Sequence, residues 1–434
     1  MDVRAIAYVM GMTDRVALLL RRAGFGPTAG ELDVARRDGA EATAARMTAR
    51  AVRDHDSHDL SILDLGPDAD SFLPDNPQPA DRTTALKLRK QQSDLLLRWW
   101  LDRMVIAGDQ VGEKLVFFWH GHWATALKKV SSPQMMLRQQ RVFREAADFA
   151  AMSRAMVTDP ALLYWLDGHL NSKDAPNENF ARELMELFML GIGNYSERDV
   201  KEAGRALTGY WVDFVHTRSV FNKDAHDGSK KTILGKTSGF SPAELINHFL
   251  SRRACPEFIA ARLWFRFASS TTPPPPDVKA RMVAAFPDPR AMLRALFLHE
   301  AFAATAGTMV KQPVEWFAGA LRQLSVRPKD FSDSVFAHMY SGLNRMGQLP
   351  LQPPSVGGWP HGIAWLTPAA AQARLDVASK LAELTDVGVR TPDDLARVLA
   401  VDIWTNRTFA ALKGVKDVRQ MLTLGLCSPE YLVS

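Results

Sequence analysis

Cysteine is scarce in this chain of 434 residues, which holds only Cys255 and Cys427. Two distant thiols cannot build a disulfide framework. Neither thiol has a further thiolate ligand near it in the sequence, so a cysteine zinc site is not indicated either. Long apolar runs are missing as well. Since a membrane-spanning helix needs about 18 or more apolar residues without a charge, we expect none.

A signal peptide is also not visible in the sequence. Residues 1–24 alternate apolar with basic residues and lack an uninterrupted apolar core followed by a small-residue cleavage site. We therefore expect a soluble chain that is cytoplasmic by default. If the sequence is that of a mature form, we expect an exported protein instead.

Charge of one sign is not concentrated anywhere. The chain has 53 Lys and Arg against 48 Asp and Glu, a net charge of +5, and the two signs are interleaved. Proteins that bind nucleic acids usually gather basic residues into a patch or stripe, whereas the basic runs in this chain are short pairs such as Arg21-Arg22. We expect no nucleic-acid partner, while an anionic substrate remains compatible with the charge.

Several common catalytic signatures are absent. The sequence contains no G-x-S-x-G elbow, no Walker loop, no G-x-G-x-x-G and no H-E-x-x-H. These absences weaken the case for a serine hydrolase and for nucleotide-dependent chemistry. The hydrophobic share of 47% and the charged share of 23% are nevertheless ordinary for a globular protein with a large core.

Helical periodicity runs through most of the chain. Apolar residues recur at helical spacing in 14–24 and 83–107, and capping residues such as Thr28 and Ser241 stand where helices should begin. We predict a mostly α-helical fold, with one globular domain of many helices covering residues 1–434. Long ordered loops and at most one short β-hairpin are expected within it.

Three segments lack this periodicity. Residues 54–82 are rich in Asp, Pro, Ser and Gly, which predicts a long loop. Residues 210–239 mix aromatic and β-branched residues with Gly and Lys, which indicates an irregular segment outside the helices. If the fold has a short β-hairpin, we expect it in this segment. Residues 348–366 carry prolines and tryptophans in a loop where regular structure is excluded.

The first candidate site is the segment NENFARELMELFMLG at 177–191. At about 100° per residue, its polar side chains share one face of a helix and its apolar side chains the other. Carboxylates held beside apolar surface have raised pKa values, which suits general acid work or metal ligation. The predicted catalytic residues are Glu178, Arg182, Glu183 and Glu186, and the predicted substrate ligands on the same segment are Asn177 and Asn179.

An ordinary surface helix is the alternative for this segment. Glu178 and Arg182 stand four residues apart, so they can form an ion pair that stabilises the helix by about 0.3 kcal/mol. Met189 and Leu190 argue against this interpretation, since they continue the polar face with apolar side chains, and the stripe contains no lysine. We therefore favour a functional role.

The second candidate is FFWHGHW at 117–123, where one glycine separates His120 from His122. On an extended backbone, residues i and i+2 point to the same side, so the two imidazoles would supply two ligands to a zinc, iron or manganese ion. Glu183 or Glu186 would complete such a site. The alternative is a pair of histidines that are hydrogen-bonded within an aromatic core.

Two further pairs are candidates for substrate binding. His226 and Asp227 lie in the irregular segment at 210–239, where the aspartate can orient the imidazole or simply form a turn with Gly228. Trp359 and Trp365 lie in the proline-rich loop, where they can stack on a sugar ring or pack into the core. The turn and the core packing are the plainer interpretations.

The motifs of the chain, taken in order, resemble those of the bacterial domain of unknown function 1800 family. They are LLRRAGFGPT, FFWHGHWAT, DPALLYWLDG, NENFARELMELFMLG, DVKEAGRALTGYW, HDGSKKTILG and PPSVGGWPHGIAW, and they cover about residues 14–380. The resemblance implies one α-helical domain and no established activity. Members of that family are often exported and often accompanied by a sulfatase-like protein, which implies such a partner and work on extracellular polymers.

These observations predict two alternative functions. The first is a hydrolase or lyase that uses the carboxylates of 178–186 with His120 and His122, with or without a divalent metal, on a polysaccharide or other anionic polymer. The second is a binding or assembly protein without catalytic activity, whose polar stripe is a buried network that fixes the packing of its helices. The sequence does not decide between them.

Overall fold

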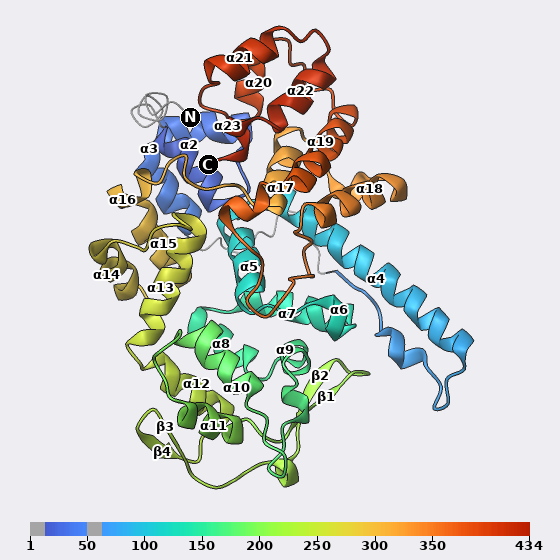
Figure 1. Ribbon diagram of the computed structural model, residues 1–434, viewed down its shortest axis with the longest axis vertical. Coiled ribbons are helices and arrows are strands. Elements are labelled where there is room, and N and C mark those ends of the chain that lie inside the picture. The colour runs from blue at the N-terminus through green and yellow to red at the C-terminus, as the bar shows by residue number, and fades with distance from the viewer. Residues whose placement is uncertain (1–13, 50–62) are drawn as a thin grey trace.

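The computed structural model describes residues 14–49 and 63–434, and most of these residues are helical (Figure 1). The helices before residue 209 are α2 (Arg15–Ala23), α3 (Ala29–Thr48), η2 (Ala69–Phe72), α4 (Pro79–Ile106), α5 (Gln110–His122), α6 (Leu127–Val130), α7 (Pro133–Glu145), α8 (Phe149–Met156), α9 (Pro160–Trp165), η3 (Gly168–Leu170), α10 (Asn179–Glu183), η4 (Leu184–Met189) and α11 (Glu197–Ala206). The later helices are η5 (Lys223–Ala225), α12 (Pro242–Leu250), α13 (Ala254–Phe267), α14 (Pro276–Ala284), α15 (Pro289–Phe297), α16 (Glu300–Ala303), α17 (Pro313–Gln323), η6 (Pro328–Asp330), α18 (Asp333–Arg345), η7 (Gly362–Trp365), α19 (Pro368–Glu383), α20 (Pro392–Val398), α21 (Asn406–Lys413), α22 (Val418–Leu426) and α23 (Pro429–Leu432).

Side-chain caps explain where many of these helices begin. Asp14 accepts hydrogen bonds from the backbone N–H groups of Val16 and Ala17, at 2.9 and 3.2 Å, at the start of α2. Thr28 and Glu31 form a capping box at the start of α3. Because the first N–H groups of a helix have no partner within it, such side chains fix the first turn.

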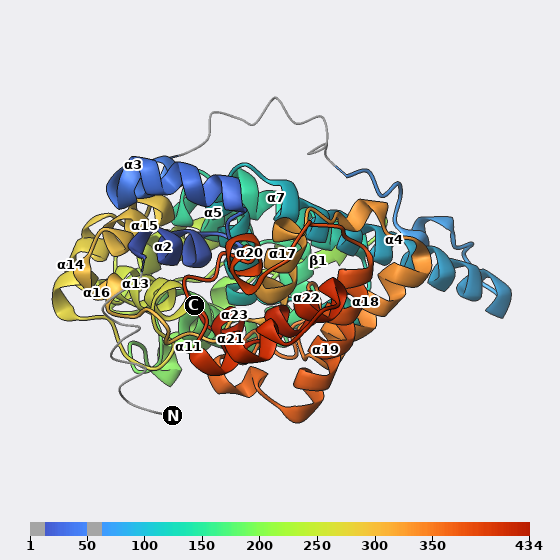
Figure 2. The same ribbon diagram turned by 90° about the horizontal axis from the view of Figure 1, so that it is seen from above.

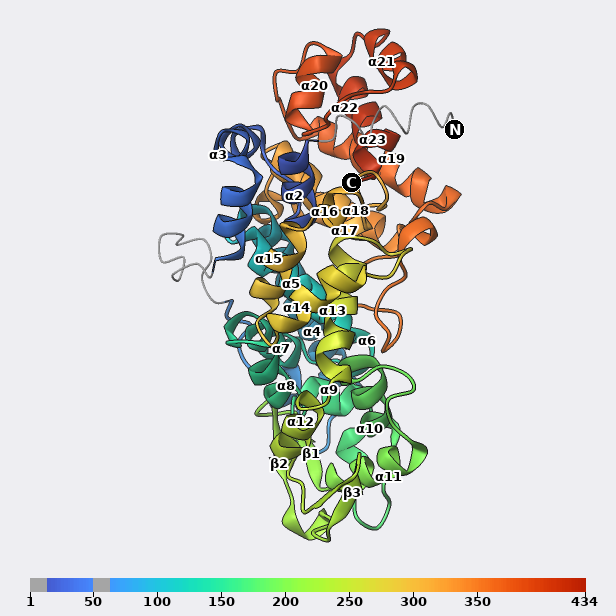
Figure 3. The ribbon, with the colours of Figure 1, turned by 90° about the vertical axis from the view of Figure 1, so that its left-hand side faces the viewer.

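The body is elongated. α2 and the C-terminal helices α20 to α23 lie toward one end of its long axis, and the strands lie at the other end (Figures 1 and 3). α4 projects away from the body on one side (Figure 2). None of the helices in the described ranges combines the length and the apolar character that a membrane span requires.

One hydrophobic core extends from Leu18 to Tyr431 and takes in most of the helices. α5 is buried around its whole circumference within this core, including Glu113 and Lys114. These buried charges have partners, since Trp100 Nε1 donates to Glu113 at 2.8 Å and Lys114 Nζ donates to a backbone carbonyl at 2.9 Å. The burial of α5 places both histidines of the motif FFWHGHW inside the protein.

The strands form two antiparallel hairpins, β1 (Tyr210–Asp213) with β2 (Arg218–Phe221) and β3 (Lys231–Ile233) with β4 (Lys236–Ser238). The prediction of a mostly α fold is confirmed, whereas the limit of one hairpin is wrong. β3 and β4 are joined by Leu234-Gly235, whose φ values of 48° and 79° are those of a two-residue I′ turn. Since leucine is not the Asn or Asp that usually marks such a turn, this hairpin has no visible signal in the sequence.

The long loops differ from the prediction in their bounds. α4 begins at Pro79, so the loop expected at 54–82 ends earlier, and its part at 54–62 lies outside the described residues. The rest of that loop contains η2, which packs on α4. The loop at 348–366 contains the short turn η7 and an isolated bridge between Ser355 and Gly358, and its prolines exclude longer regular elements.

Candidate functional site

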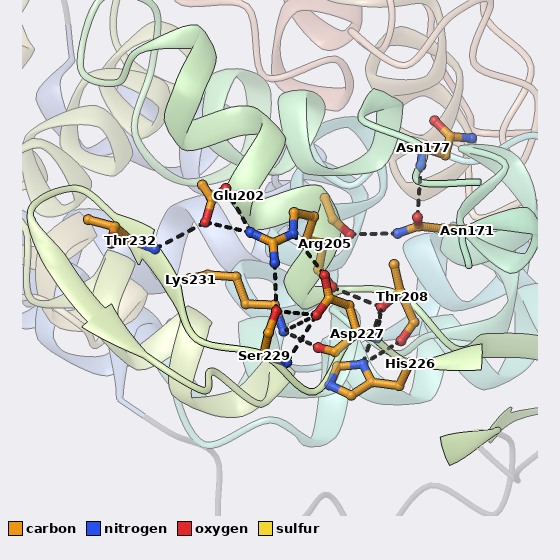
Figure 4. Close-up of polar contacts among 11 residues, drawn as sticks. Asn171, Asn177, Glu202, Arg205, Thr208, His226, Asp227, Ser229, Lys231 and Thr232 are labelled. Atoms are coloured by element: carbon orange, nitrogen blue, oxygen red, sulfur yellow. Dashed lines mark hydrogen bonds and ion pairs between the residues drawn. The ribbon is translucent and has the colours of Figure 1, made fainter. Parts of the chain in front are cut away.

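Asp227 belongs to a closed set of polar contacts at the hairpin end of the molecule, which we term the Arg205 network (Figure 4). Its members are Glu202, Arg205, Thr208, His226, Asp227, Ser229, Lys231 and Thr232. Arg205 Nε donates to Asp227 Oδ2 at 2.8 Å, and its Nη2 donates to Ser229 Oγ at 2.6 Å. Both carboxylate oxygens of Glu202 accept from Arg205 Nη1, at 2.9 and 3.0 Å. Glu202 also accepts from the backbone N–H of Thr232 in β3 at 3.2 Å, so α11 is tied to the second hairpin.

His226 and Asp227 are both held by Thr208. The backbone carbonyl of Thr208 lies 2.9 Å from His226 Nδ1, and since a carbonyl only accepts, Nδ1 carries the proton. The N–H of Asp227 donates to Thr208 Oγ1 at 2.8 Å. Burial raises the pKa of Asp227, but the hydrogen bonds from Ser229 and Arg205 outweigh it and hold that pKa well below its ordinary value. The substrate role of His226 and Asp227 stays a prediction, and both already have partners within the protein.

Asn177 and Asn179 hold the backbone before α10. The N–H of Asn177 donates to Asn171 Oδ1 at 2.8 Å, and Asn171 Nδ2 donates to the carbonyl of Gly204 at 2.8 Å (Figure 4). Asn177 and Asn179 each donate a side-chain N–H to a backbone carbonyl of the preceding segment, at 3.2 and 3.1 Å. These contacts satisfy backbone groups that would otherwise lack partners, so they explain both asparagines without a substrate.

The first part of the predicted polar stripe is a surface ion-pair cluster. Arg182 forms a bidentate pair with Glu197, with both N–O distances at 2.7 Å, and it lies 3.6 Å from Glu178. The hydrogen bonds with Glu197 raise the pKa of Arg182. All three side chains are in contact with solvent, where such pairs contribute little to stability. This arrangement matches the alternative of an ordinary helix surface for Glu178 and Arg182.

The second part of the stripe, Glu183 and Glu186, has a different environment. Tyr195 donates its hydroxyl proton to Glu186 Oε2 at 2.7 Å. Burial, and then this hydrogen bond, raise the pKa of Tyr195, so the phenol keeps its proton. Burial, and then the charge of Glu186, raise the pKa of Glu183, which has no hydrogen bond or ion pair with another described residue. Two neighbouring carboxylates in different surroundings are the usual condition for an acid and base pair.

These carboxylates lie where the helix changes type. α10 ends at Glu183 and continues as the π-helix η4. π-helical turns are rare in proteins, and those that occur are often found at functional sites. A wheel of about 100° per residue does not apply to such a turn. η4 is followed by Gly191, whose φ is +79° and where a Cβ would lie 2.9 Å from the ring of Phe258. Only glycine fits this turn.

His120 and His122 do not point to one place. Both belong to α5, where residues i and i+2 point about 200° apart, whereas the predicted metal pair required an extended backbone. The two imidazoles therefore cannot hold one ion from the same side. Across 14–49 and 63–434, no three side chains of His, Cys, Asp or Glu are grouped as a metal site requires.

Each of these histidines is instead held by a backbone group. The N–H of Leu351 donates to His120 Nε2 at 3.2 Å, so the proton of His120 is on Nδ1. His122 Nε2 lies 3.0 Å from the carbonyl of Phe188, so in His122 it is Nε2 that carries the proton. Burial lowers the pKa of each to about 3, and the charge of Arg262 adds to the shift at His122. Both imidazoles are therefore neutral at neutral pH.

His122 and Glu186 line the same cleft, which we term the His122 cleft. It has a volume of about 430 Å³ and lies between α5, η4, α13, α14 and the proline-rich loop. A smaller cavity of about 60 Å³, which we term the Trp359 cavity, adjoins it, since Arg262 and Gly357 line both. Three of the motifs recognised in the sequence therefore converge at one place.

The proline-rich loop reaches the cleft because two glycines touch. Gly358 has a φ of +83°, and a Cβ at this position would lie 2.5 Å from the carbonyl oxygen of Gly121. Only glycine allows so close an approach. The contact places Trp359 against Phe117 and His120, with ring centroids 5.6 and 5.4 Å apart.

The two tryptophans predicted to bind substrate differ in their surroundings. Trp359 is partly buried and lines the smaller cavity. Trp365 is 1% exposed and lines neither the cleft nor the cavity. A stacking role in a cavity is therefore compatible with Trp359 alone of the two, while Trp365 packs inside the protein.

Arg262 is a candidate that the sequence interpretation missed. It lies on α13, its Nε is buried without a hydrogen-bond partner, and no described residue forms an ion pair with it. Burial lowers its pKa. The sequence does carry a signal for Arg262, since two arginines stand in the apolar run ARLWFRF. The second of them, Arg266, however pairs with Glu315 at 2.8 Å. Only the geometry separates the two arginines.

These features define a mostly helical protein with a polar cleft between the helices of one core. The chain belongs to the family described as protein of unknown function (DUF1800), a model of which matches residues 18–433. The match extends beyond the range of 14–380 that the motifs indicate and includes the C-terminal helices. No match to the chain was found among curated proteins or among solved structures.

Proposed function

We propose that the protein is a hydrolase or lyase that acts on a polysaccharide or other anionic polymer in the His122 cleft. The observation that supports this proposal is the hydrogen bond of 2.7 Å between Tyr195 and Glu186 at the cleft wall. Glu183, three residues earlier, has a raised pKa, first because of burial and then because of the charge of Glu186. Carboxylates in such different surroundings can divide the roles of acid and base.

In the proposed reaction, Glu186 is the base and Glu183 the acid. In a hydrolase, Glu186 takes a proton from water, the water oxygen bonds to the sugar carbon, and the bond to the leaving oxygen breaks as Glu183 gives that oxygen its proton. In a lyase, Glu186 takes the proton from a carbon, a double bond forms between that carbon and its neighbour, the bond from the neighbour to the leaving oxygen breaks, and this oxygen receives the proton of Glu183. Tyr195 keeps the Glu186 carboxylate in place in both reactions.

A binding or assembly protein without catalytic activity is the alternative. The contacts of Asn177, Asn179 and Arg182 favour it, because each of these side chains has partners within the protein. A divalent metal and a sulfatase-like partner protein also stay predictions. Elemental analysis of the purified protein, with and without His120→Ala, tests the metal.

The experiment that tests the proposed reaction is a comparison of Glu186→Gln with the unchanged chain on a panel of anionic polysaccharides. Glutamine keeps the size of the side chain and an acceptor for Tyr195, but it cannot take a proton. We expect the unchanged chain to cleave at least one polymer and Glu186→Gln to be slower by about 100-fold or more. Products that have gained water indicate a hydrolase, and unsaturated products indicate a lyase.

Glu41→Gln is the matched control, since Glu41 is exposed on α3 and has no contact with the cleft. This control should retain the full rate. A Glu186→Gln chain that is as fast as Glu41→Gln contradicts the proposed reaction.

A further inference from the structure

We propose that Arg262 binds a negatively charged group of the ligand where the His122 cleft meets the Trp359 cavity, and that the ligand is an acidic sugar chain that occupies both. This inference rests on the proposed function, because it names the substrate class of the same cleft. The feature that carries it is the position of an unpaired guanidinium in the wall that the two cavities share.

Arg262 is half-buried, yet it lacks the partners that an arginine in this position normally has. A guanidinium offers five N–H donors, yet no hydrogen bond or ion pair joins Arg262 to another described residue, and its Nε is shielded from solvent. Withdrawing a charge from water without a partner is unfavourable. A ligand that brings an anion to this position would supply the missing partner.

The other charges of the His122 cleft already have partners. Lys279 Nζ lies 3.0 Å from Glu257, which also pairs with Arg253 at 2.6 Å. Glu186 accepts the hydrogen bond from Tyr195. Glu186 keeps its negative charge, because its partner Tyr195 is a neutral phenol. Arg262 is therefore the cation of this cleft without an ion-pair partner among the described residues, and an anionic group that reaches it would supply one.

Arg266, one helical turn after Arg262, shows what a structural arginine on α13 looks like. It is 9% exposed, pairs with Glu315 at 2.8 Å and lies over the ring of Phe117 at 5.6 Å. It also lines the Trp359 cavity, but Glu315, which it shares with Lys114, gives it an ion-pair partner. The two arginines share a helix face, and Arg262 differs from Arg266 in having no ion-pair partner among the described residues.

The walls on either side of Arg262 are suited to sugar rings. Phe258 and Val356 line the cleft, and Phe265, Trp359 and His361 line the cavity. The guanidinium of Arg262 lies 6.0 Å from the centroid of the Phe265 ring. Ligand sites typically combine such apolar and aromatic walls with a few polar groups that fix orientation. A chain with one ring on each side of its charged group would use both walls.

The charged group is a carboxylate or a sulfate ester. Both present oxygen atoms that can accept two parallel hydrogen bonds from one guanidinium, which a neutral hydroxyl cannot match in strength. A uronic acid chain and a sulfated sugar chain share this chemistry. The experiment below includes both, with a neutral chain of equal length for comparison.

The test is a calorimetric titration of the full chain carrying Glu186→Gln, so that turnover does not consume the probe. The probes are a uronic acid tetramer, a sulfated sugar tetramer and a neutral tetramer. We expect at least one acidic tetramer to bind about tenfold or more tightly than the neutral one, and Arg262→Gln to remove this preference. Arg262→Lys should retain part of it, because lysine keeps the charge but not the paired donors.

Arg252→Gln is the matched control for loss of charge, since Arg252 is exposed just before α13 and lines neither cavity. It should bind as tightly as the parent chain. A melting curve confirms that Arg262→Gln is folded, which we expect because Arg262 has no partner to lose. The proposal is overturned if neither acidic tetramer binds, if the neutral tetramer binds equally well, or if Arg262→Gln binds unchanged.

The outcomes separate this inference from the proposed reaction. If Arg262→Gln loses the preference while Glu186→Gln cleaves polymers at the full rate, Arg262 is the anion-binding residue and the assigned base is wrong. If Glu186→Gln is inactive while Arg262→Gln binds acidic tetramers normally, the reaction stands and the role of Arg262 is wrong.

Discussion

The Arg205 network and the His122 cleft contain the same kinds of side chain, but they differ in how their charges are paired. In the network, Arg205 has partners on three side chains, and Lys231, which is 1% exposed, donates to the backbone carbonyl of Asp227. In the cleft, Arg262 has no hydrogen-bond or ion-pair partner within 14–49 and 63–434, and the Nδ1 atom of His122 is buried without a hydrogen bond to these residues.

This difference distinguishes polar residues that stabilise the fold from polar residues that are available to a ligand. A network whose donors and acceptors are satisfied becomes rigid and specifies one packing, and a ligand would have to break its hydrogen bonds. A buried group without a partner reduces stability, and such groups are rare enough in folded proteins to call for an explanation. In this protein, a region with many polar contacts, such as the Arg205 network, is therefore a poor candidate for a binding site.

The largest expected effect is that of breaking the network. Arg205→Met leaves Glu202 and Asp227 without their principal partner, so we expect the free energy of unfolding to fall by about 2–3 kcal/mol. Urea unfolding measures this loss. Lys201→Met, an exposed change on the same helix, should cost less than about 0.5 kcal/mol. Equal losses in the two variants would show that the network does not stabilise the fold.

A smaller effect, per pH unit, concerns the pH dependence of the free energy of unfolding. The two regions contribute to this dependence in different pH ranges. His122 has a pKa of about 3 in the folded chain against 6.5 when exposed, so the unfolded chain binds more protons between these values. The free energy of unfolding therefore falls as the pH falls through this window. We expect His122→Gln to flatten this dependence by up to about 1 kcal/mol per pH unit, as measured by urea unfolding at a series of pH values.

Asp227 provides the contrasting measurement. Its pKa is lowered below the ordinary 3.8, so the stability that it contributes is present above that pH and lost below it. Asp227→Asn should accordingly change the pH dependence only in the more acidic range. If both variants changed the same range, the difference between the two regions would not hold.

The smallest expected effect is that of removing the unpaired charge. Arg262→Met replaces a guanidinium without partners by an apolar side chain of similar length, so we expect the melting temperature to stay unchanged or to rise slightly. Differential scanning calorimetry measures it. A loss as large as that of Arg205→Met would mean that Arg262 is a structural residue.

Much of the fold could be predicted from local signals. Thr28 with Glu31 and Ser241 with Glu244 are capping boxes that are visible in the sequence and present in the structure. The second hairpin could not be predicted, because its turn has leucine where a small polar residue is usual. Local rules identify elements whose residues follow the common preferences and miss those that do not.

The candidate site could be predicted only in part. The motifs that hold His122 and Glu186 were recognisable, since both combine polar with apolar residues in short segments. The direction of each imidazole depends on α5 being helical as far as His122, which the glycine at 121 obscured. Arg262 could not be singled out, because the absence of a partner is a property of the packed structure and not of neighbouring residues.

The π-helix η4 has a consequence for how the chain tolerates changes in length. A π-helical turn spans about one residue more than an α-helical turn. Loss of a single residue between 184 and 189 would therefore let the segment close as an ordinary helix while everything after it kept nearly its present direction relative to α10. Gly191 would stay against Phe258, whereas one inserted residue would rotate Gly191 away from it. A single deletion in this segment is consequently expected to be less disruptive than a single insertion.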